Sequence, residues 1–355
     1  MYLKKLYPII ICLISISMNI LGQEKDIYSL LTEKYVDRPL AMHKGQLQVN
    51  TGYEFSIINK AFDVDGGQID LATDGSVFSK HLFPFDIRLG ILEYVQFNAS
   101  TNYGSMGIRS QIDWMISLDT FFLSKELYSY KGFDDLYLGL DLTVPFPSDF
   151  PVNWIFAGGI HLPVFGHEPD KPSHSIQVLE PLILQAEGTA LQFNPKFGSG
   201  VPFINFGTGI KYRLRQFSFI GSFNYKTGLN EGKSITWRSR YRNGEFEYVS
   251  SPYEYRVSNV MVFYGEVAWQ AINWFAVTAY YSGFKNSGGW SGISGQKVAL
   301  YDESLHSIGL GYEIQVSPSL RFNQQTVLPF NGKNIMAPWI FNIGISFNFI
   351  SSRYN

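Results

Sequence analysis

The feature that most constrains this chain is an alternation of apolar and polar residues that begins near residue 45 and recurs almost to the C-terminus. In residues 46–57, for example, Leu47, Val49 and Phe55 alternate with Gln48 and other polar residues. Successive side chains of a strand point to opposite faces, so each such stripe predicts a strand with one apolar and one polar face. The stripes are about 10–14 residues long. Typical sandwich strands have about 5–6 residues, whereas tilted strands that cross a membrane have about 9–11.

Composition narrows the class of protein further. The 355 residues are 45% hydrophobic and 16% aromatic, and only 16% are charged, against about 25% in average soluble domains. Low charge and many aromatics argue against a disordered chain. A mean hydropathy of −0.03 argues against a bundle of membrane helices, which needs several runs of about 20 apolar residues. With 28 Lys and Arg against 30 Asp and Glu, no basic surface suits nucleic acid.

The first 22 residues are expected to be a secretory signal peptide. Lys4 and Lys5 precede the uncharged apolar stretch Leu6–Ile20, and Gly22 is a small residue at a plausible cleavage edge. The alternative is a single transmembrane anchor, although the stretch is shorter than the roughly 20 residues that span a bilayer. The only cysteine, Cys12, lies inside this stretch, so the mature chain is predicted to contain no disulfide and no thiolate site.

Counting the stripes predicts an all-β antiparallel transmembrane barrel. Twelve strands are expected, at residues 45–58, 77–91, 94–103, 133–146, 151–164, 201–214, 216–229, 255–270, 273–285, 304–316, 318–330 and 338–350. Residues 107–123 also alternate, and with a partner near 178–193 they would raise the count to fourteen. The expected division is a signal peptide (1–22), a leader, periplasmic segment or plug (23–44), the barrel (45–350) and a C-terminal tail (351–355).

The predicted connections fall into a short and a long class. The short ones are Leu92–Glu93, Pro147–Phe150, Arg215, Ala271–Ile272 and Ser317. The long ones lie near 59–75, 104–132, 165–200, 230–254 and 286–303. Short periplasmic turns and long external loops are the asymmetry of an outer-membrane barrel. The sequence therefore predicts a protein of the outer membrane of a Gram-negative bacterium, in contact with membrane lipid and lipopolysaccharide.

The aromatic surplus suits the same architecture. Aromatic side chains at outward positions near strand ends can form the two girdles of a membrane barrel, and the alternative is a soluble aromatic core. The candidates for the girdles are Tyr103, Phe165, Tyr212, Phe217, Trp269 and Trp274.

The last strand carries a spaced set of residues, Asn342, Gly344, Phe347 and Phe349. This set resembles the signal by which assembly machinery identifies the final strand of bacterial barrels. The resemblance implies the barrel-assembly machinery as a partner.

A longer resemblance covers most of the mature chain. It rests on the segments DIRLGILEYVQFNAS, GFDDLYLGLDL, FAGGIHLPVFG, FGSGVPFINFGTGIKYRLRQFSFIGSFNYKTG and SIGLGYEIQVSPSLRFNQQTVLPFNGKN. Together they resemble the outer-membrane barrels of the putative MetA-pathway of phenol degradation family, which are distantly similar to FadL-type channels. One departure is Pro163-Val164-Phe165-Gly166 in place of a Pro-Thr-Gly segment. The resemblance implies a transporter-like barrel for small hydrophobic or aromatic compounds.

If the apolar stripes face lipid, charged residues on the opposite faces line the lumen. The candidates are Glu54, Asp86, Arg88, Asp135, Asp141, His161, Lys211, Arg213, Lys226, Glu266, Glu313 and Arg321. They can form a paired network that fills a narrow lumen, or a charged pathway that selects solutes. The sequence leaves both interpretations open.

The external loops provide further hypotheses. Residues 236–255 and 283–296 are rich in Gly, Trp, Tyr and Arg and can capture sugars or aromatic ligands, which would suit a structural or adhesive barrel. Four residues of the first loop can instead bind lipopolysaccharide phosphates, since guanidinium groups fit phosphate well. They are Arg238, Arg240, Tyr241 and Arg242.

Catalysis has little support in the sequence. The chain has no HExxH, GxSxG or GxxxxGK[ST] segment. Asp134 and Asp135 with His167 can imitate the site of a rim hydrolase, and His161, His167 and His174 can bind a metal only if a loop brings them together. We therefore predict no enzyme, no cofactor and no metal.

Overall fold

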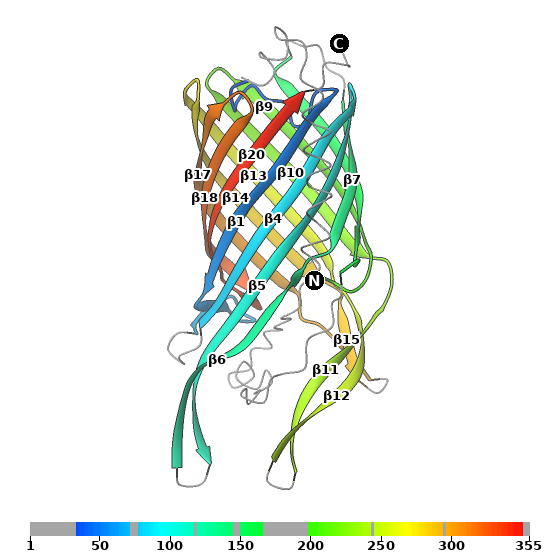
Figure 1. The fold of residues 1–355 in the computed structure, drawn as a ribbon, viewed down its shortest axis with the longest axis vertical. Helices are drawn as coiled ribbons and strands as arrows, with labels where there is room; N and C mark the ends of the chain where they lie inside the picture. The colour runs from blue at the N-terminus through cyan, green and yellow to red at the C-terminus, as the bar shows by residue number, and fades with distance from the viewer. Residues whose placement is uncertain are drawn as a thin grey trace.

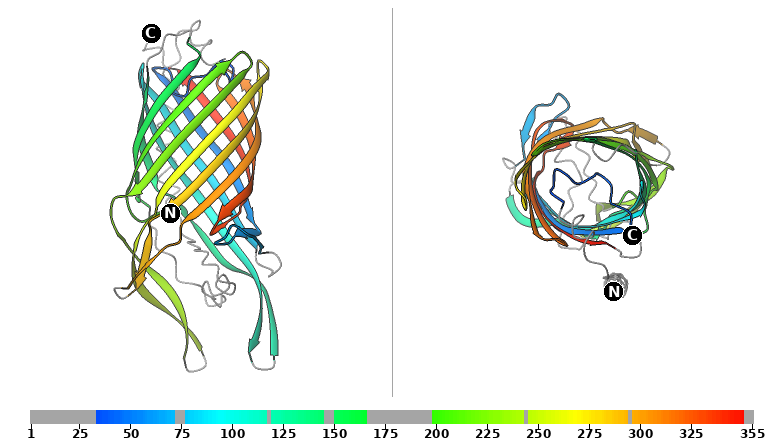
Figure 2. Two further views of the ribbon diagram at one scale, coloured as in Figure 1. Left: turned by 180° about the vertical axis from the view of Figure 1, so that it is seen from behind. Right: turned by 90° about the horizontal axis from the view of Figure 1, so that it is seen from above.

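The computed structural model describes residues 33–71, 77–116, 119–144, 150–165, 198–242, 245–293 and 296–350. Twelve strands of this part form a closed antiparallel barrel, because β4 pairs with both β1 and β5 (Figures 1 and 2). No helix among these residues is long and apolar enough to cross a membrane. In chain order the barrel strands are β1 (Gln46–Ile58), β4 (Val77–Leu92), β5 (Val95–Ile116), β7 (Leu136–Thr143), β8 (Val152–Leu162), β9 (Phe203–Leu214), β10 (Phe217–Gly228), β13 (Asn259–Ile272), β14 (Phe275–Ser287), β17 (Glu303–Ser317), β18 (Leu320–Lys333) and β20 (Trp339–Ile350).

Each of the twelve predicted strands overlaps one barrel strand, so the predicted fold is confirmed. The alternative with fourteen strands is wrong. Residues 107–116 belong to the far part of β5 and residues 119–123 to β6 (Asp119–Phe133), and the two strands pair with each other. This hairpin extends beyond the barrel instead of joining its wall (Figure 1). The suggested partner near 178–193 lies outside the described residues.

The two rims differ as the sequence predicts. Turns of two residues join β4 to β5, β9 to β10, β13 to β14 and β17 to β18 at one rim. Hairpins project from the other rim (Figure 1). They include a sheet of β11 (Gly232–Arg242), β12 (Glu245–Arg256), β15 (Trp290–Ile293) and β16 (Gln296–Ala299). A third, small sheet contains β2 (Lys60–Phe62), β3 (Gln68–Asp70) and β19 (Ile335–Met336).

The outer face of the barrel is apolar and open. Leu310, Val316 and Phe206 expose 66%, 62% and 55% of their surface. Five of the six predicted girdle residues are also exposed, by 36–54%: Tyr103, Tyr212, Phe217, Trp269 and Trp274. Because the strands satisfy one another's backbone groups around a closed ring, this apolar face is suited to hydrocarbon.

Leu310 provides a test of this assignment. It lies in the middle of β17 and points away from the lumen. Leu310→Arg is expected to lower the free energy of unfolding by about 2–4 kcal/mol, because it places a charge near the bilayer midplane. Urea unfolding in lipid vesicles measures this quantity. The inward-facing control Gln325→Arg in β18 should cost little, and equal losses for both variants would contradict the outward position of Leu310.

Candidate functional site

Residues 33–44, called the plug segment below, cross the barrel interior at the short-turn rim. The view along the barrel axis shows this part of the chain in dark blue inside the ring of strands (Figure 2, right). Near its start the backbone N–H of Arg38 donates to the carbonyl of Lys34 at 3.1 Å, which makes a tight turn. At its end Gly45, with φ of 75°, donates to the carbonyl of Gly90 at 2.8 Å. Glycine adopts this left-handed conformation without strain, so the segment leads directly into β1.

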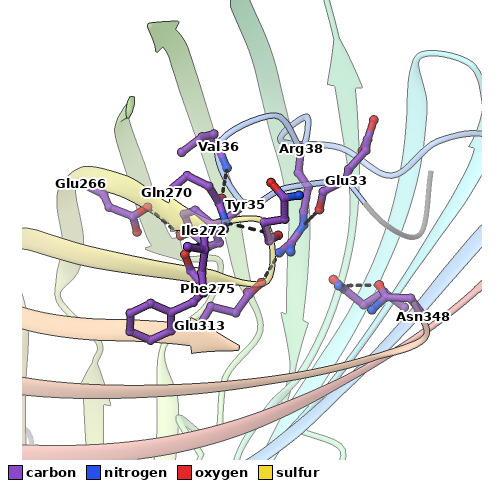
Figure 3. A network of polar contacts seen from close by, with 12 residues as sticks. Glu33, Tyr35, Val36, Arg38, Glu266, Gln270, Ile272, Phe275, Glu313 and Asn348 are labelled. Atoms are coloured by element: carbon purple, nitrogen blue, oxygen red, sulfur yellow. Dashed lines mark hydrogen bonds and ion pairs between the residues drawn. The ribbon is translucent and has the colours of Figure 1, made fainter. Parts of the chain in front are cut away.

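Strand β13 holds the first part of the plug segment (Figure 3). The Tyr35 hydroxyl donates to Glu266 at 2.6 Å, and the Val36 N–H donates to the side-chain carbonyl of Gln270 at 3.4 Å. Tyr264 also donates to Glu266. Burial and the neighbouring Glu266 carboxylate raise the pKa of Tyr35 well above its usual value. The Tyr35 hydroxyl therefore stays protonated and remains a donor.

Arg38 and Lys211 hold the middle of the segment. Arg38 forms an ion pair with Glu313 of β17, in which both side chains are largely buried. The Lys211 ammonium, on β9, donates at 2.9 Å to the carbonyls of Tyr35 and Arg38. Hydrogen bonds to charged groups contribute about 1.5–3 kcal/mol each, so these contacts attach the middle of the segment to β9 and β17.

The opposite wall holds the last part of the segment. The Leu40 N–H donates to Asn153 of β8 at 2.8 Å, and the Met42 N–H donates to Gln96 of β5 at 2.6 Å. Contacts with β5, β8, β9, β13 and β17 therefore surround the segment. The plug segment obstructs the straight path along the barrel axis at this rim.

A cavity of about 580 Å³ lies between the plug segment and the wall formed by β18, β20, β1 and β4. Its charges are arranged in pairs: Arg88 contacts Asp86 at 2.9 Å, and Asn50 donates to the same carboxylate at 2.6 Å. Neutral amide side chains make up much of the remaining lining, and they are Gln46, Gln48, Asn50, Asn102, Asn323, Gln325 and Asn342. The cavity beside the plug is therefore lined by paired charges and amides next to apolar groups such as Leu40 and Met42 of the plug segment.

The strand register places eleven of the twelve predicted lumen residues on the inward face. Those that contact the plug segment are Lys211, Arg213, Glu266 and Glu313. Others line the cavity, and they are Asp86, Arg88 and Arg321. The rest face other parts of the lumen, and they are Glu54, Asp141, His161 and Lys226.

Asp135 differs from its predicted position. It precedes β7, which begins at Leu136 and not at residue 133. Its carboxylate accepts from the backbone N–H of Ser199 at 3.0 Å and from the Ser199 hydroxyl. The reason is local: Gly198 has φ of 83°, and the turn that follows points its donors at Asp135. Asp135 therefore anchors the chain that enters β9 and is not part of a strand lining the lumen.

A proline interrupts the wall beside the cavity. Residues Thr51 and Glu54 of β1 pair with Phe85 and Leu82 of β4, but no pairing occurs between them, where Pro84 lies. Proline has no N–H to donate to a ladder. The interval, called the Pro84 seam below, opens on the cavity, because Thr51, Pro84 and Phe85 all belong to its lining.

The residues of the predicted assembly signal lie in β20. The register turns Asn342 and Gly344 toward the lumen and Phe347 and Phe349 toward the outside. The aromatic positions of the signal therefore belong to the lipid-facing surface, of which Phe347 exposes 40%.

The remaining predicted sites lie mostly outside the described residues. His167 and His174 lie outside the described residues, whereas His161 lies on β8 and faces the lumen. Of the predicted loop, residues 236–242 belong to β11 and residues 245–255 to β12. The side chains of Arg238, Arg240, Tyr241 and Arg242 are not described. Where side chains are described, no three His, Cys, Asp or Glu residues gather as metal ligands.

Sequence reasoning missed the contacts of the plug segment and the Pro84 seam. Nothing periodic distinguishes Tyr35 and Arg38, because their partners lie more than 200 residues away in the chain. The seam did have a signal: Pro84 stands in the middle of an alternating stripe, where a proline marks a strand without a continuous ladder.

No family model matches the chain, and no curated protein is significantly similar to it. The resemblance to the MetA-pathway family therefore stays a prediction. Among solved structures, the COG4313 outer membrane channel from Pseudomonas putida F1 aligns with a TM-score of 0.61 at 8% identity, over 87% of this chain and 97% of its own. The P. putida toluene transporter TodX aligns with a TM-score of 0.46 at 12% identity, over 91% and 94% of the two chains.

The first of these likenesses shows a shared fold. Together with the closed ring of strands and the apolar outer face, it identifies the chain as a β-barrel of the Gram-negative outer membrane. The short turns of such barrels face the periplasm, so the plug segment lies at the periplasmic end of the lumen.

Proposed function

We propose that the barrel is a channel that takes small hydrophobic or aromatic solutes through the outer membrane. One observation carries the proposal: part of the inner wall of the external half is apolar. The strip comprises Val260, Val262, Phe284, Leu305, Val327 and Ile340. Apolar side chains on an inward face have no role in a water-filled pore, and they favour a solute that is itself apolar.

The register arranges these side chains in two patches. Val262 pairs with Phe284, and Phe284 pairs with Leu305. Val327 pairs with Ile340 on the next two strands. Leu305 pairs with Gly332 and Val327 with Gly309, so the two patches are offset along β17 and β18, and together they give an apolar solute two surfaces on the inner wall.

The way out is proposed to be lateral. The plug segment obstructs the periplasmic end, and the cavity beside it is lined by charges and amides that an apolar solute does not satisfy. The Pro84 seam opens on this cavity and offers a way out that does not pass the plug segment, since two pairs of the ladder between β1 and β4 are missing there.

A structural or adhesive barrel is the second candidate. The hairpins β5–β6 and β11–β12 project well beyond the wall (Figure 1), as a binding surface for other molecules would. In either case, lipopolysaccharide around the wall and assembly machinery that reads β20 are proposed partners. An adhesive barrel would not accelerate the entry of any solute.

The apolar strip is tested by Phe284→Ser combined with Leu305→Ser. Each fully buried apolar side chain contributes about 1.5–3 kcal/mol, so the double variant is expected to slow entry of a radiolabelled alkylbenzene into cells by about tenfold or more. Val298→Ser, which removes an exposed apolar side chain from the external sheet, is the control and should leave entry unchanged. Entry no faster in cells with the native barrel than in cells without it would contradict a channel.

The seam is tested by a disulfide across it. Tyr53 and Phe83 face each other there, with ring centroids 5.3 Å apart. Their replacement by cysteines should let oxidation close the seam, stop alkylbenzene entry, and let a reductant restore it. Phe223 and Phe263, 5.2 Å apart on a continuous ladder, form the matched control pair. Unchanged entry through the oxidised seam variant would rule out the lateral route.

A further inference from the structure

A row of aromatic side chains faces the lumen on β7, β8 and β9. Its first member, Tyr137, lies against the backbone of two inward-facing glycines. A Cβ atom added to Gly139 would come within 2.2 Å of the Tyr137 hydroxyl, and one added to Gly159 within 2.5 Å of its ring. Only glycine at both positions leaves room for the ring, so the wall is shaped to hold Tyr137 flat.

Two more rings continue this surface. Tyr137 pairs with His161, and His161 pairs with Phe203, so the three side chains form one row on the inner wall. The ring centroids of Tyr137 and His161 are 4.8 Å apart, at an interplanar angle of 42°. Neighbouring strands are about 4.8 Å apart, so the row is about 10 Å long. This length accommodates a single aromatic ring and its substituent.

An ammonium group ends the row. Lys226 of β10 places its Nζ 4.3 Å from the centre of the Phe203 ring. Within the described residues it forms no ion pair and donates no hydrogen bond. A half-buried cation without a close anion is unfavourable, and a cation–π contact with phenylalanine offsets only part of that cost.

The nearest carboxylates are committed elsewhere. Asp135 accepts from the N–H and the hydroxyl of Ser199. Asp134 accepts from Asn102 at 3.3 Å and from the Asp135 N–H at 2.9 Å. Neither carboxylate forms an ion pair with Lys226, although both act on it at longer range. An anionic ligand would place a carboxylate within hydrogen-bond distance of its ammonium.

We propose that this row binds a planar aromatic carboxylate, with its ring against Tyr137 and His161 and its carboxylate on Lys226 Nζ, while the buried Phe203 ring lies beneath the ammonium. The inference rests on the proposed channel function and names a solute class for it. A neutral hydrocarbon would cover the rings but leave the ammonium unpaired. An aliphatic anion would pair with the ammonium but leave the rings uncovered.

Benzoate and its neutral isostere benzamide test the proposal, through equilibrium binding to the purified, folded barrel in detergent. The native protein should bind benzoate about tenfold more tightly than benzamide, since the benzamide carbonyl can accept from the ammonium but carries no negative charge to pair with it. Lys226→Met keeps the length of the side chain and should abolish this preference. Equal binding of the two probes by the native protein would overturn the proposal.

Lys80 provides the matched control. It faces the lumen from β4, across the barrel from β10, so Lys80→Met removes the same charge without touching the aromatic row. The preference for benzoate should survive in this variant, and an equal loss in both lysine variants would show that only the overall lumen charge matters. Tyr137→Leu should weaken benzoate and benzamide alike. Binding of both probes at native strength in Tyr137→Leu would overturn the role of the rings.

The binding experiment and the entry experiment can fail independently of each other. If alkylbenzene entry still depends on Phe284 and Leu305 but benzoate is not preferred, the row is not an aromatic-acid site and the channel proposal stands. If benzoate binds but no solute enters faster, the row is a binding site in a barrel that is not a channel.

Discussion

The absence of water in hydrocarbon is the constraint on which this structure depends. Every backbone N–H and C=O in the wall needs a partner, and only a closed ring of strands supplies them all. From this follow the alternating faces, the tight turns at one rim and the continuous ladders between neighbouring strands. Pro84 is the exception: it cannot donate, and the ladder between β1 and β4 is interrupted beside the cavity.

In the lumen the groups that need partners are side chains and not backbone groups. Inward polar side chains of a narrow barrel need partners other than bulk water. At the periplasmic end the plug segment supplies them: Arg38 pairs with Glu313, and Tyr35 donates to Glu266. Beside the plug, charges pair on the wall itself, as Asp86 and Arg88 do. Toward the external end, the ammonium of Lys226 lies over the Phe203 ring, and it forms no ion pair within the described residues. The charge pattern of the lumen thus separates a closed, paired region from a region suited to a ligand.

Much of this architecture could be predicted from sequence, because the period of two directly reports the two environments of each strand. Stripes such as residues 318–330 located the strands to within a few residues, and they placed Lys211 and Glu266 on the inward face. Long-range contacts carry no such period, so the role of Tyr35 and Arg38 could not be foreseen. The alternating segment 107–123 led to the alternative with fourteen strands for a different reason. A hairpin that leaves the barrel has the same alternation as a strand of the wall.

The central claim is that the straight path through the barrel is closed by the plug segment and not by the wall. The conductance of single barrels in planar bilayers tests this most directly, by comparing a chain of residues 23–355 with a variant that also lacks residues 23–44. The deletion ends before β1, so it leaves every barrel strand intact. The account predicts little current through the full chain and a large, steady conductance in the variant. A large conductance of equal size in both proteins would contradict it.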